Sequence, residues 1–272
     1  MDFNQLTQET FEAIQRIFPC EEDLKDKVPL ERIVMAFQDK LVPQTHPFCI
    51  RIAGQSGSGK SSQLLPAVEQ VLKGTPYLKI SVGDFARFHP AYADLMTTNP
   101  GHMREITNGF ALRALFMFYT YCVEHKVNIL LDMTLLEPVT ETYMMTLAKN
   151  KGYRIHTHVL CVPKKVSDMF IKIREKQTKR QVDVSSARYF FNALPRALKT
   201  LTALNIFTQA DKLILWTHTL SRPLKMTGLS NKAVGRLLGQ YRCGPKTIKN
   251  PKELLKYKHP WMRNLVWELV HV

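Results

Sequence analysis

A glycine-rich segment from residue 54 to residue 61 has the residue types of a loop that holds phosphate groups. Its sequence, GQSGSGKS, matches the pattern G-x-x-x-x-G-K-[ST] without a mismatch. The glycines let the backbone curl so that successive N–H groups point at phosphate oxygens, and a helix that follows adds the positive end of its dipole. We expect Lys60 to reach the β- and γ-phosphates of ATP and the Ser61 hydroxyl to ligate Mg²⁺. The predicted ATP-binding residues are Gly54, Gln55, Ser56, Gly57, Ser58, Gly59, Lys60, Ser61 and Ser62.

Two acidic residues follow strand-like segments. Asp84 comes just after the apolar segment 77–82, and Asp132 closes the segment 127–132. Because ligands of open parallel sheets bind at the carboxyl ends of strands, Asp84 is expected beside the phosphate loop. A carboxylate there can take a proton from an acceptor hydroxyl or hold the water shell of a metal ion, and Thr134 can add a hydroxyl contact. Helix capping for Asp84 and turn chemistry for Asp132 explain the same residues equally well, so both interpretations stay open.

Two arginines, Arg174 and Arg188, flank a polar, weakly patterned stretch at 175–186. Phosphoryl transfer develops negative charge on the equatorial oxygens of the moving group, and guanidinium groups on a mobile segment stabilise that charge. The stretch between the arginines has the composition of a lid. The alternative is that both are solvated arginines on helices, which is the commoner fate of this residue type.

Strand-like and helical segments alternate through the middle of the chain, which predicts a parallel sheet covered by helices on both faces, of the P-loop NTPase kind. Two N-terminal helices are expected within residues 2–42, with a break near Pro29. We divide the chain into an N-terminal helical segment (1–46), a core (47–220) and a basic C-terminal extension (221–272). The expected strands are 48–53, 77–82, 127–132, 154–162 and 212–217, and the expected helices are 60–73, 103–125, 139–151, 164–176 and 187–205.

Composition limits the class of protein. With 45% hydrophobic and 22% charged residues, the chain is expected to fold as a globular protein. The longest apolar run, 111–123, is interrupted by Arg113 and is too short to span a bilayer, and no secretory signal is visible, so the cytoplasm is the expected compartment. The five cysteines are widely spaced; Cys49 and Cys161 lie in apolar strands and are expected to be buried thiols.

The net charge of +15 favours an anionic ligand, and both nucleotides and nucleic acid satisfy that. Much of the charge lies in the C-terminal extension, where a lysine cluster at 246–258 has Tyr257 and Trp261 nearby. This cluster can bind nucleic acid or an acidic partner. We favour a solvated basic face whose apolar residues dock on the core, because no nucleic-acid motif is present.

Over about residues 48–217, the chain resembles the zeta toxin family, the kinases of bacterial toxin–antitoxin systems. The resemblance is carried by the order of several motifs and not by the phosphate loop alone. After that loop come Gly83-Asp84-x-x-Arg87 with His89-Pro90, an acidic residue and threonine at 132 and 134, Lys149-Asn150-Lys151-Gly152-Tyr153, Val162-Pro163, the paired arginines, Leu194-Pro195 and Asn205-Ile206-Phe207.

By this resemblance, Asp84 takes the position of the family's general base. Lys60, Arg174 and Arg188 take phosphate-neutralising positions. The substrate-binding positions fall on Arg87, His89, Asp132 and Thr134. Known members phosphorylate the sugar 3′-hydroxyl of UDP-N-acetylglucosamine or related UDP-amino sugars, and an antitoxin is the partner that such a family implies.

The sequence departs from the family pattern around the acceptor. Asp132-Met133-Thr134 replaces Glu-Gly-Thr, which shortens the acid and is expected to add bulk to the acceptor wall. The stretch 110–122 has no acid where the family offers a glutamate. Because a hydrogen-bonding site is sensitive to a lost polar partner, other acceptors stay open: an NAD ribose, a nucleoside or a polynucleotide end. A nucleotide-binding regulatory module without turnover is a further alternative.

Overall fold

The computed structural model describes residues 12, 28–134, 138–178, 184–203, 211–216, 224–225, 229–230 and 232–237. Five strands form a parallel sheet, and a sixth short strand pairs antiparallel to the fifth, in the order β2-β3-β1-β4-β5-β6. The predicted fold class, a P-loop NTPase-like α/β sheet, is therefore confirmed. The strands are β1 (Phe48–Gly54), β2 (Leu78–Ser81), β3 (Ile129–Asp132), β4 (Arg154–Leu160), β5 (Lys212–Trp216) and β6 (Leu224–Lys225).

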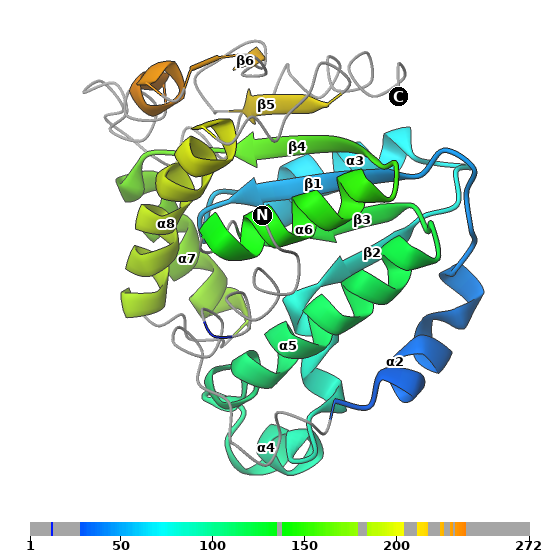
Figure 1. Cartoon of the computed structure of the whole chain (residues 1–272). Coiled ribbons are helices and arrows are strands. Elements are labelled where there is room, and N and C mark those ends of the chain that lie inside the picture. The colour runs from blue at the N-terminus through cyan, green and yellow to red at the C-terminus, as the bar shows by residue number, and fades with distance from the viewer. Residues whose placement is uncertain are drawn as a thin grey trace. The chain divides into compact units, whose positions relative to one another are not determined.

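All five predicted strands and all five predicted helices of the core are present, with ends that differ by a few residues. The sequence pattern missed α4, because none of its residues is buried and it therefore carries no apolar stripe. The helices are α2 (Leu30–Phe37), α3 (Leu65–Val71), α4 (Tyr92–Thr98), α5 (Met103–Glu124), α6 (Pro138–Asn150), α7 (Lys164–Thr178) and α8 (Val184–Ala203), labelled in Figure 1. Single turns of 3₁₀ helix cover Gln38–Lys40, Val82–Asp84 and Ala86–Phe88, and a π-helical turn covers Lys60–Leu64.

The chain divides into two compact units, of which the first comprises residues 1–49, 76–131 and 137–154. Its core is built around α5, which is buried on nearly every side from Phe110 to Val123, as expected for a helix without a polar face. The Phe118 ring lies 5.1 Å from the Phe37 ring of α2 and 5.7 Å from the Phe85 ring, measured between centroids. The Tyr119 hydroxyl donates to a carbonyl oxygen of α6 at 3.0 Å. Aromatic packing therefore fixes α2 on α5, and a buried hydrogen bond ties α6 to α5.

The Tyr153 hydroxyl is a buried polar anchor of the same unit. It lies 3.1 Å from the Cys122 carbonyl oxygen and 2.8 Å from the Val127 carbonyl oxygen, to which it donates. Burial, with a smaller contribution from the nearby thiols of Cys49 and Cys122, raises the pKa of Tyr153 well above its ordinary value of about 10. In the pH range in which Tyr153 of the unfolded chain begins to ionise, the hydroxyl of the folded chain therefore stays protonated.

We expect Tyr153→Phe to lower the free energy of unfolding by about 1–3 kcal/mol, because the buried Val127 carbonyl oxygen loses the hydroxyl that donates to it. The folded-state pKa of Tyr153 is raised, so its contribution is fully present below pH about 10 and is lost as the pH rises further. Urea denaturation near pH 8 and near pH 10.5 measures both effects. The difference between wild type and variant should shrink at the higher pH; an equal difference at both would contradict the raised pKa.

The second unit comprises residues 50–75, 132–136 and 155–272. Within it, β4 runs parallel to β5 (Figure 1). His156 lies opposite Lys212, and Leu160 lies opposite Trp216. One buried apolar cluster joins these strands to α8 and to a helical turn at 232–237. The cluster consists of Ala53, Val159, Cys161, Leu194, Ala197, Leu198, Leu213, Leu215 and Val234. Both β6 and Val234 lie beyond residue 220, within the predicted C-terminal extension. The division of the chain into segments 1–46, 47–220 and 221–272 stays a prediction.

Other sequence-based expectations concern particular residues. Cys49 and Cys161 are buried thiols, as predicted, and Cys122 is buried too, which raises the pKa of its thiol. Among the described helices, none combines the length and the apolar character that a bilayer crossing requires. The first predicted N-terminal helix, apart from Glu12, and the lysine cluster at 246–258 lie outside the described residues.

Candidate functional site

The glycine-rich loop leaves β1, all of whose residues are buried. Its three glycines have φ angles of 149° at Gly54, 71° at Gly57 and 94° at Gly59. Residues with a side chain rarely adopt positive φ angles, which is why the curled loop requires glycine at these positions. After Gly59 the chain enters the π-helical turn and then α3. The strand, the curled loop and the helical start therefore have the order that phosphate binding requires.

Contacts from the β4–α7 region hold the back of the loop. The Gln55 side chain donates to the Val162 carbonyl oxygen at 2.5 Å and is buried, so Gln55 can face a ligand only with its backbone. The Ser167 hydroxyl, on the first turn of α7, donates to the Ser56 carbonyl oxygen. A Cβ atom on Gly57 would overlap the Ser167 carbonyl oxygen. The loop is thus seated directly on the helix that carries Arg174.

Ser167 is a residue of this site that the sequence analysis missed. No motif surrounds it, and its bonding partner lies 111 positions away in the chain. The one available signal was its place at the start of the helix that follows β4. Such a helix starts beside the carboxyl ends of the strands, where ligands of parallel sheets bind.

The Lys60 ammonium group lies over the loop that precedes it. Its Nζ donates to the Gly54 carbonyl oxygen at 2.7 Å and to the Gln55 carbonyl oxygen at 3.3 Å. Ser61 and Ser62 are exposed, and the Ser62 hydroxyl contacts the Gly59 carbonyl oxygen at 3.4 Å. The flexible lysine stem allows Nζ to exchange neutral carbonyl partners for phosphate oxygens, which form stronger, charge-assisted bonds.

The donors around the loop fit a magnesium ion that comes with a nucleotide. No group of three or more His, Cys, Asp or Glu in the described part of the chain could enclose a metal ion. Mg²⁺ is ordinarily held by few protein ligands together with substrate phosphates and water. The exposed Ser61 hydroxyl at the start of the π-helical turn suits that arrangement.

The segment Asp132-Met133-Thr134 lies beside β1 in the second unit. The Met133 N–H donates to the Ile52 carbonyl oxygen at 3.2 Å, so this segment is tied to the strand that leads into the phosphate loop. Asp132 and Thr134 are half-buried. Met133 is only 5% exposed, so its side chain is buried, and its expected effect on the acceptor wall stays a prediction.

Asp84 belongs to the first unit and has a structural partner there. Its Oδ2 accepts the Ser81 backbone N–H at 2.7 Å and the Ser81 hydroxyl at 2.9 Å. With Ser81 as the N-cap, the two residues form a capping box around the 3₁₀ turn Val82–Asp84. Asp84 therefore takes part in helix capping, as one of the two interpretations predicted. It does so as the third residue of the turn, whereas Ser81 is the N-cap residue. The pair of bonds fixes the carboxylate at the end of β2 without excluding a catalytic role.

The other predicted substrate residues of the first unit have different surroundings. Arg87 is exposed, and its guanidinium carbon lies 5.4 Å from the Phe37 ring centroid and 5.0 Å from the Phe88 ring centroid. His89 is buried, accepts the Ala91 N–H on Nδ1 at 3.1 Å and meets the Phe110 ring edge-on. Packing against aromatic rings orients both residues. Arg174 lies on α7 and Arg188 on α8, but their side chains are outside what the structure describes.

Comparison with known proteins decides the family. A model of the family described as "Zeta toxin" matches residues 34–220, which is more than half of the chain and includes the phosphate loop. This chain belongs to the zeta toxin family. The resemblance predicted from the motifs over about residues 48–217 is confirmed, and the match extends a little further at both ends. No curated protein matches the sequence significantly.

Solved structures support the fold of this zeta toxin family member. A structure from the PezAT chromosomal toxin–antitoxin system of Streptococcus pneumoniae is 19% identical, with a TM-score of 0.66 over 94% of this chain and 99% of that chain. A chain of the AvrRxo1-ORF1:AvrRxo1-ORF2 complex, determined with ATP, is 11% identical, with a TM-score of 0.51 over 88% of this chain and 74% of that chain. At these identities, the likeness establishes the fold.

The loop geometry gives a test of how tightly the zeta toxin phosphate loop is seated. We expect Gly57→Ala to weaken ATP binding by at least about tenfold, because hydrogen bonds to charged phosphate oxygens are worth about 1.5–3 kcal/mol each. Gly74→Ala is the matched control: its φ of 87° imposes the same left-handed strain, but a Cβ there meets nothing within 4 Å. Calorimetric titration with an ATP analogue compares the two. Equal affinities would mean that contact with Ser167 does not position the loop.

Proposed function

We propose that this protein is a kinase that transfers the γ-phosphoryl group of ATP to a hydroxyl of a small nucleotide-type acceptor, a UDP-amino sugar. The observation that carries the proposal is a complete phosphate loop, with left-handed glycines and a lysine and serine at its end, in a chain of the zeta toxin family. That a related fold was determined with ATP supports the choice of nucleotide.

The proposed chemistry divides among a few groups. Backbone N–H groups of the loop and Lys60 hold the phosphates, and Arg174 and Arg188 neutralise the charge that develops during transfer. Asp84 takes the proton of the acceptor hydroxyl as its oxygen attacks the γ-phosphorus, the bond between that phosphorus and the β–γ bridging oxygen breaks, and ADP leaves. Ser61 would hold Mg²⁺ together with the nucleotide phosphates, and the bound ion would supply positive charge that stabilises the transfer.

The acceptor is assigned to the UDP-amino sugars by the family resemblance, which carries the substrate positions onto Arg87, His89, Asp132 and Thr134. Asp132, although shorter than glutamate, keeps a carboxylate beside the strand that enters the phosphate loop.

The same proposal includes an antitoxin as protein partner. The related PezAT structure comes from a toxin–antitoxin system, and the AvrRxo1-ORF1 structure is a complex with AvrRxo1-ORF2. Co-expression with the product of a small neighbouring reading frame tests this part. A complex that co-purifies and restores growth supports it; unrestrained growth inhibition in the presence of every neighbouring product would count against it.

The decisive experiment incubates the protein and Mg²⁺ with γ-labelled ATP and a panel of acceptors: UDP-N-acetylglucosamine and related UDP-sugars, NAD, nucleosides and oligonucleotides. We expect the label on a sugar hydroxyl of a UDP-amino sugar, identified by mass spectrometry. Label on NAD, a nucleoside or an oligonucleotide would keep the kinase and replace its acceptor. Binding of ATP without transfer to any acceptor would instead favour a regulatory nucleotide-binding module.

A further inference from the structure

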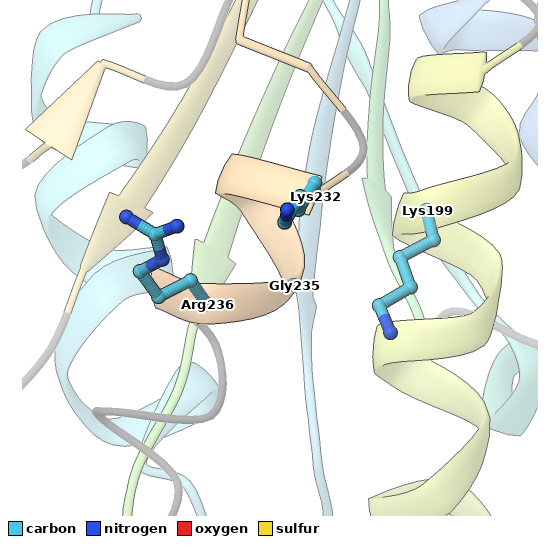
Figure 2. Close-up of a pocket in the computed structure, with 4 residues that line it drawn as sticks. All are labelled: Lys199, Lys232, Gly235 and Arg236. Carbon is cyan, nitrogen blue, oxygen red and sulfur yellow. The ribbon is translucent and has the colours of Figure 1, made fainter.

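A second group of cationic side chains gathers in the second unit, and none of them belongs to the phosphate loop. A pocket of about 420 Å³ is lined by Lys199 of α8 and by Lys232, Gly235 and Arg236 of the helical turn at 232–237. Figure 2 shows the lysine of α8 on one side and the two cations of the helical turn on the other. The volume lies within the range of roughly 300–1,000 Å³ that small-molecule sites occupy.

Buried apolar contacts hold the two walls of this pocket together. Ala197 and Leu198, next to Lys199 on α8, share one core cluster with Val234 of the helical turn. Lys199, Lys232 and Arg236 are exposed, while Val234 is completely buried. The cations are therefore mounted on two elements whose spacing is fixed by the core, as a preformed site requires.

Gly235 has a particular relation to Lys199. A Cβ atom on Gly235 would lie 2.5 Å from Cε and 3.2 Å from Nζ of Lys199. The Lys199 side chain therefore occupies the space where a side chain at position 235 would stand. Gly235 lies in a helical turn, where glycine is less favourable than alanine by about 1 kcal/mol. The space that glycine leaves is taken by the side chain of Lys199, which also lines the pocket.

No carboxylate is among the described residues that line this pocket. The described residues that line the pocket are three cations and a glycine, and none of the cations forms an ion pair with another described residue. Like charges held near one another repel, and the net charge of +15 adds to the positive potential. An anion that enters the pocket relieves this repulsion and receives charge-assisted hydrogen bonds, including the paired donors of a guanidinium group.

We propose that the pocket of Lys199, Lys232 and Arg236 is a binding site for a compact polyanion of the diphosphate class, separate from the phosphate loop. Three cations that line one pocket match a ligand with two or more negative charges. Nucleic acid is disfavoured, because its backbone calls for a basic stripe and its bases for aromatic platforms, whereas this site is one concave pocket without a described aromatic residue in its lining. Free inorganic diphosphate and the diphosphate moiety of a nucleotide share the required chemistry.

Equilibrium dialysis with radiolabelled inorganic diphosphate tests the proposal. We expect Arg236→Ala to weaken binding roughly tenfold or more, as for loss of a charged hydrogen-bond donor. The Lys60→Ala variant, which is changed in the phosphate loop and not in the pocket, should still bind diphosphate in the pocket. This result would hold even if the proposed kinase function were wrong. Lys73→Ala, which removes an exposed cation of the same unit outside the pocket, is the charge-matched control and should bind as wild type does.

A double-mutant cycle separates the pocket from general electrostatics. Gly235→Ala should weaken diphosphate binding by displacing the Lys199 ammonium group, while leaving thermal stability unchanged or slightly raised. In the Lys199→Ala background, the same substitution should have no further effect on binding, because the group that it displaces is gone. Additive losses at positions 199 and 235 would overturn the assignment of Lys199 to the site.

Competition with unlabelled ligands in the Lys60→Ala variant distinguishes the two sources. Displacement of the label by ADP at concentrations comparable to diphosphate assigns the site to a nucleotide; displacement by diphosphate alone assigns it to the free anion. Either result supports the site. Diphosphate binding that is indifferent to positions 199, 232 and 236 would overturn it. The proposed site would also be overturned if substitutions at these positions weakened the binding of single-stranded oligonucleotides but not of diphosphate.

Discussion

Asp84→Asn is expected to lower turnover by a factor of roughly 10² or more while ATP affinity stays close to that of wild type, as for the loss of a general base. The substitution keeps the size of the side chain and removes its capacity to take a proton. Its measurement is a steady-state and single-turnover comparison with γ-labelled ATP and the acceptor identified for the wild type. A reduction confined to KM would point to binding and not to proton transfer.

The structure adds a control that the sequence did not offer. Asp84 accepts both the N–H and the hydroxyl of Ser81, so its removal also disturbs a capping box. Ser81→Ala removes the hydroxyl but keeps the carboxylate and its bond to the backbone N–H. If Asp84 is the base, Ser81→Ala costs at most about 0.5–2 kcal/mol of stability and little turnover. If both variants lose turnover equally, the carboxylate acts by shaping the turn, and its catalytic assignment is wrong.

Lys60→Ala is expected to lower turnover by a factor of roughly 10²–10³, the usual effect of removing one donor that stabilises transition-state charge. The variant should also abolish growth inhibition when the protein is expressed, if that inhibition depends on phosphoryl transfer. In the structure its Nζ donates to the Gly54 and Gln55 carbonyl oxygens of the loop.

Lys73→Ala is the matched control for this experiment, because it removes an exposed lysine just beyond α3. Growth assays and labelled-ATP turnover should separate the two variants clearly. Growth inhibition that persists in Lys60→Ala, with turnover lost, would show that the phenotype does not arise from the kinase. Turnover that persists would remove Lys60 from the mechanism.

Local features of this protein were predictable because contiguous residues encode them. The left-handed glycines at 57 and 59, and the lysine and serine that follow, form a pattern whose backbone conformation is set within eight residues. The apolar runs of β1 to β5 predict buried parallel strands, because both faces of such strands are covered. The family followed from the order of these motifs.

Tertiary structure decided which distant groups meet, because such contacts depend on how strands and helices pack. Ser167 reaches the phosphate loop across 111 positions, and Met133 turns its bulk into the core, although neither has a local signature. Lys199 and Arg236 share a pocket because Val234 and the inner face of α8 are buried together. The sequence by itself determined the fold class and the phosphate loop; packing alone decided what seats that loop and which distant cations line one pocket.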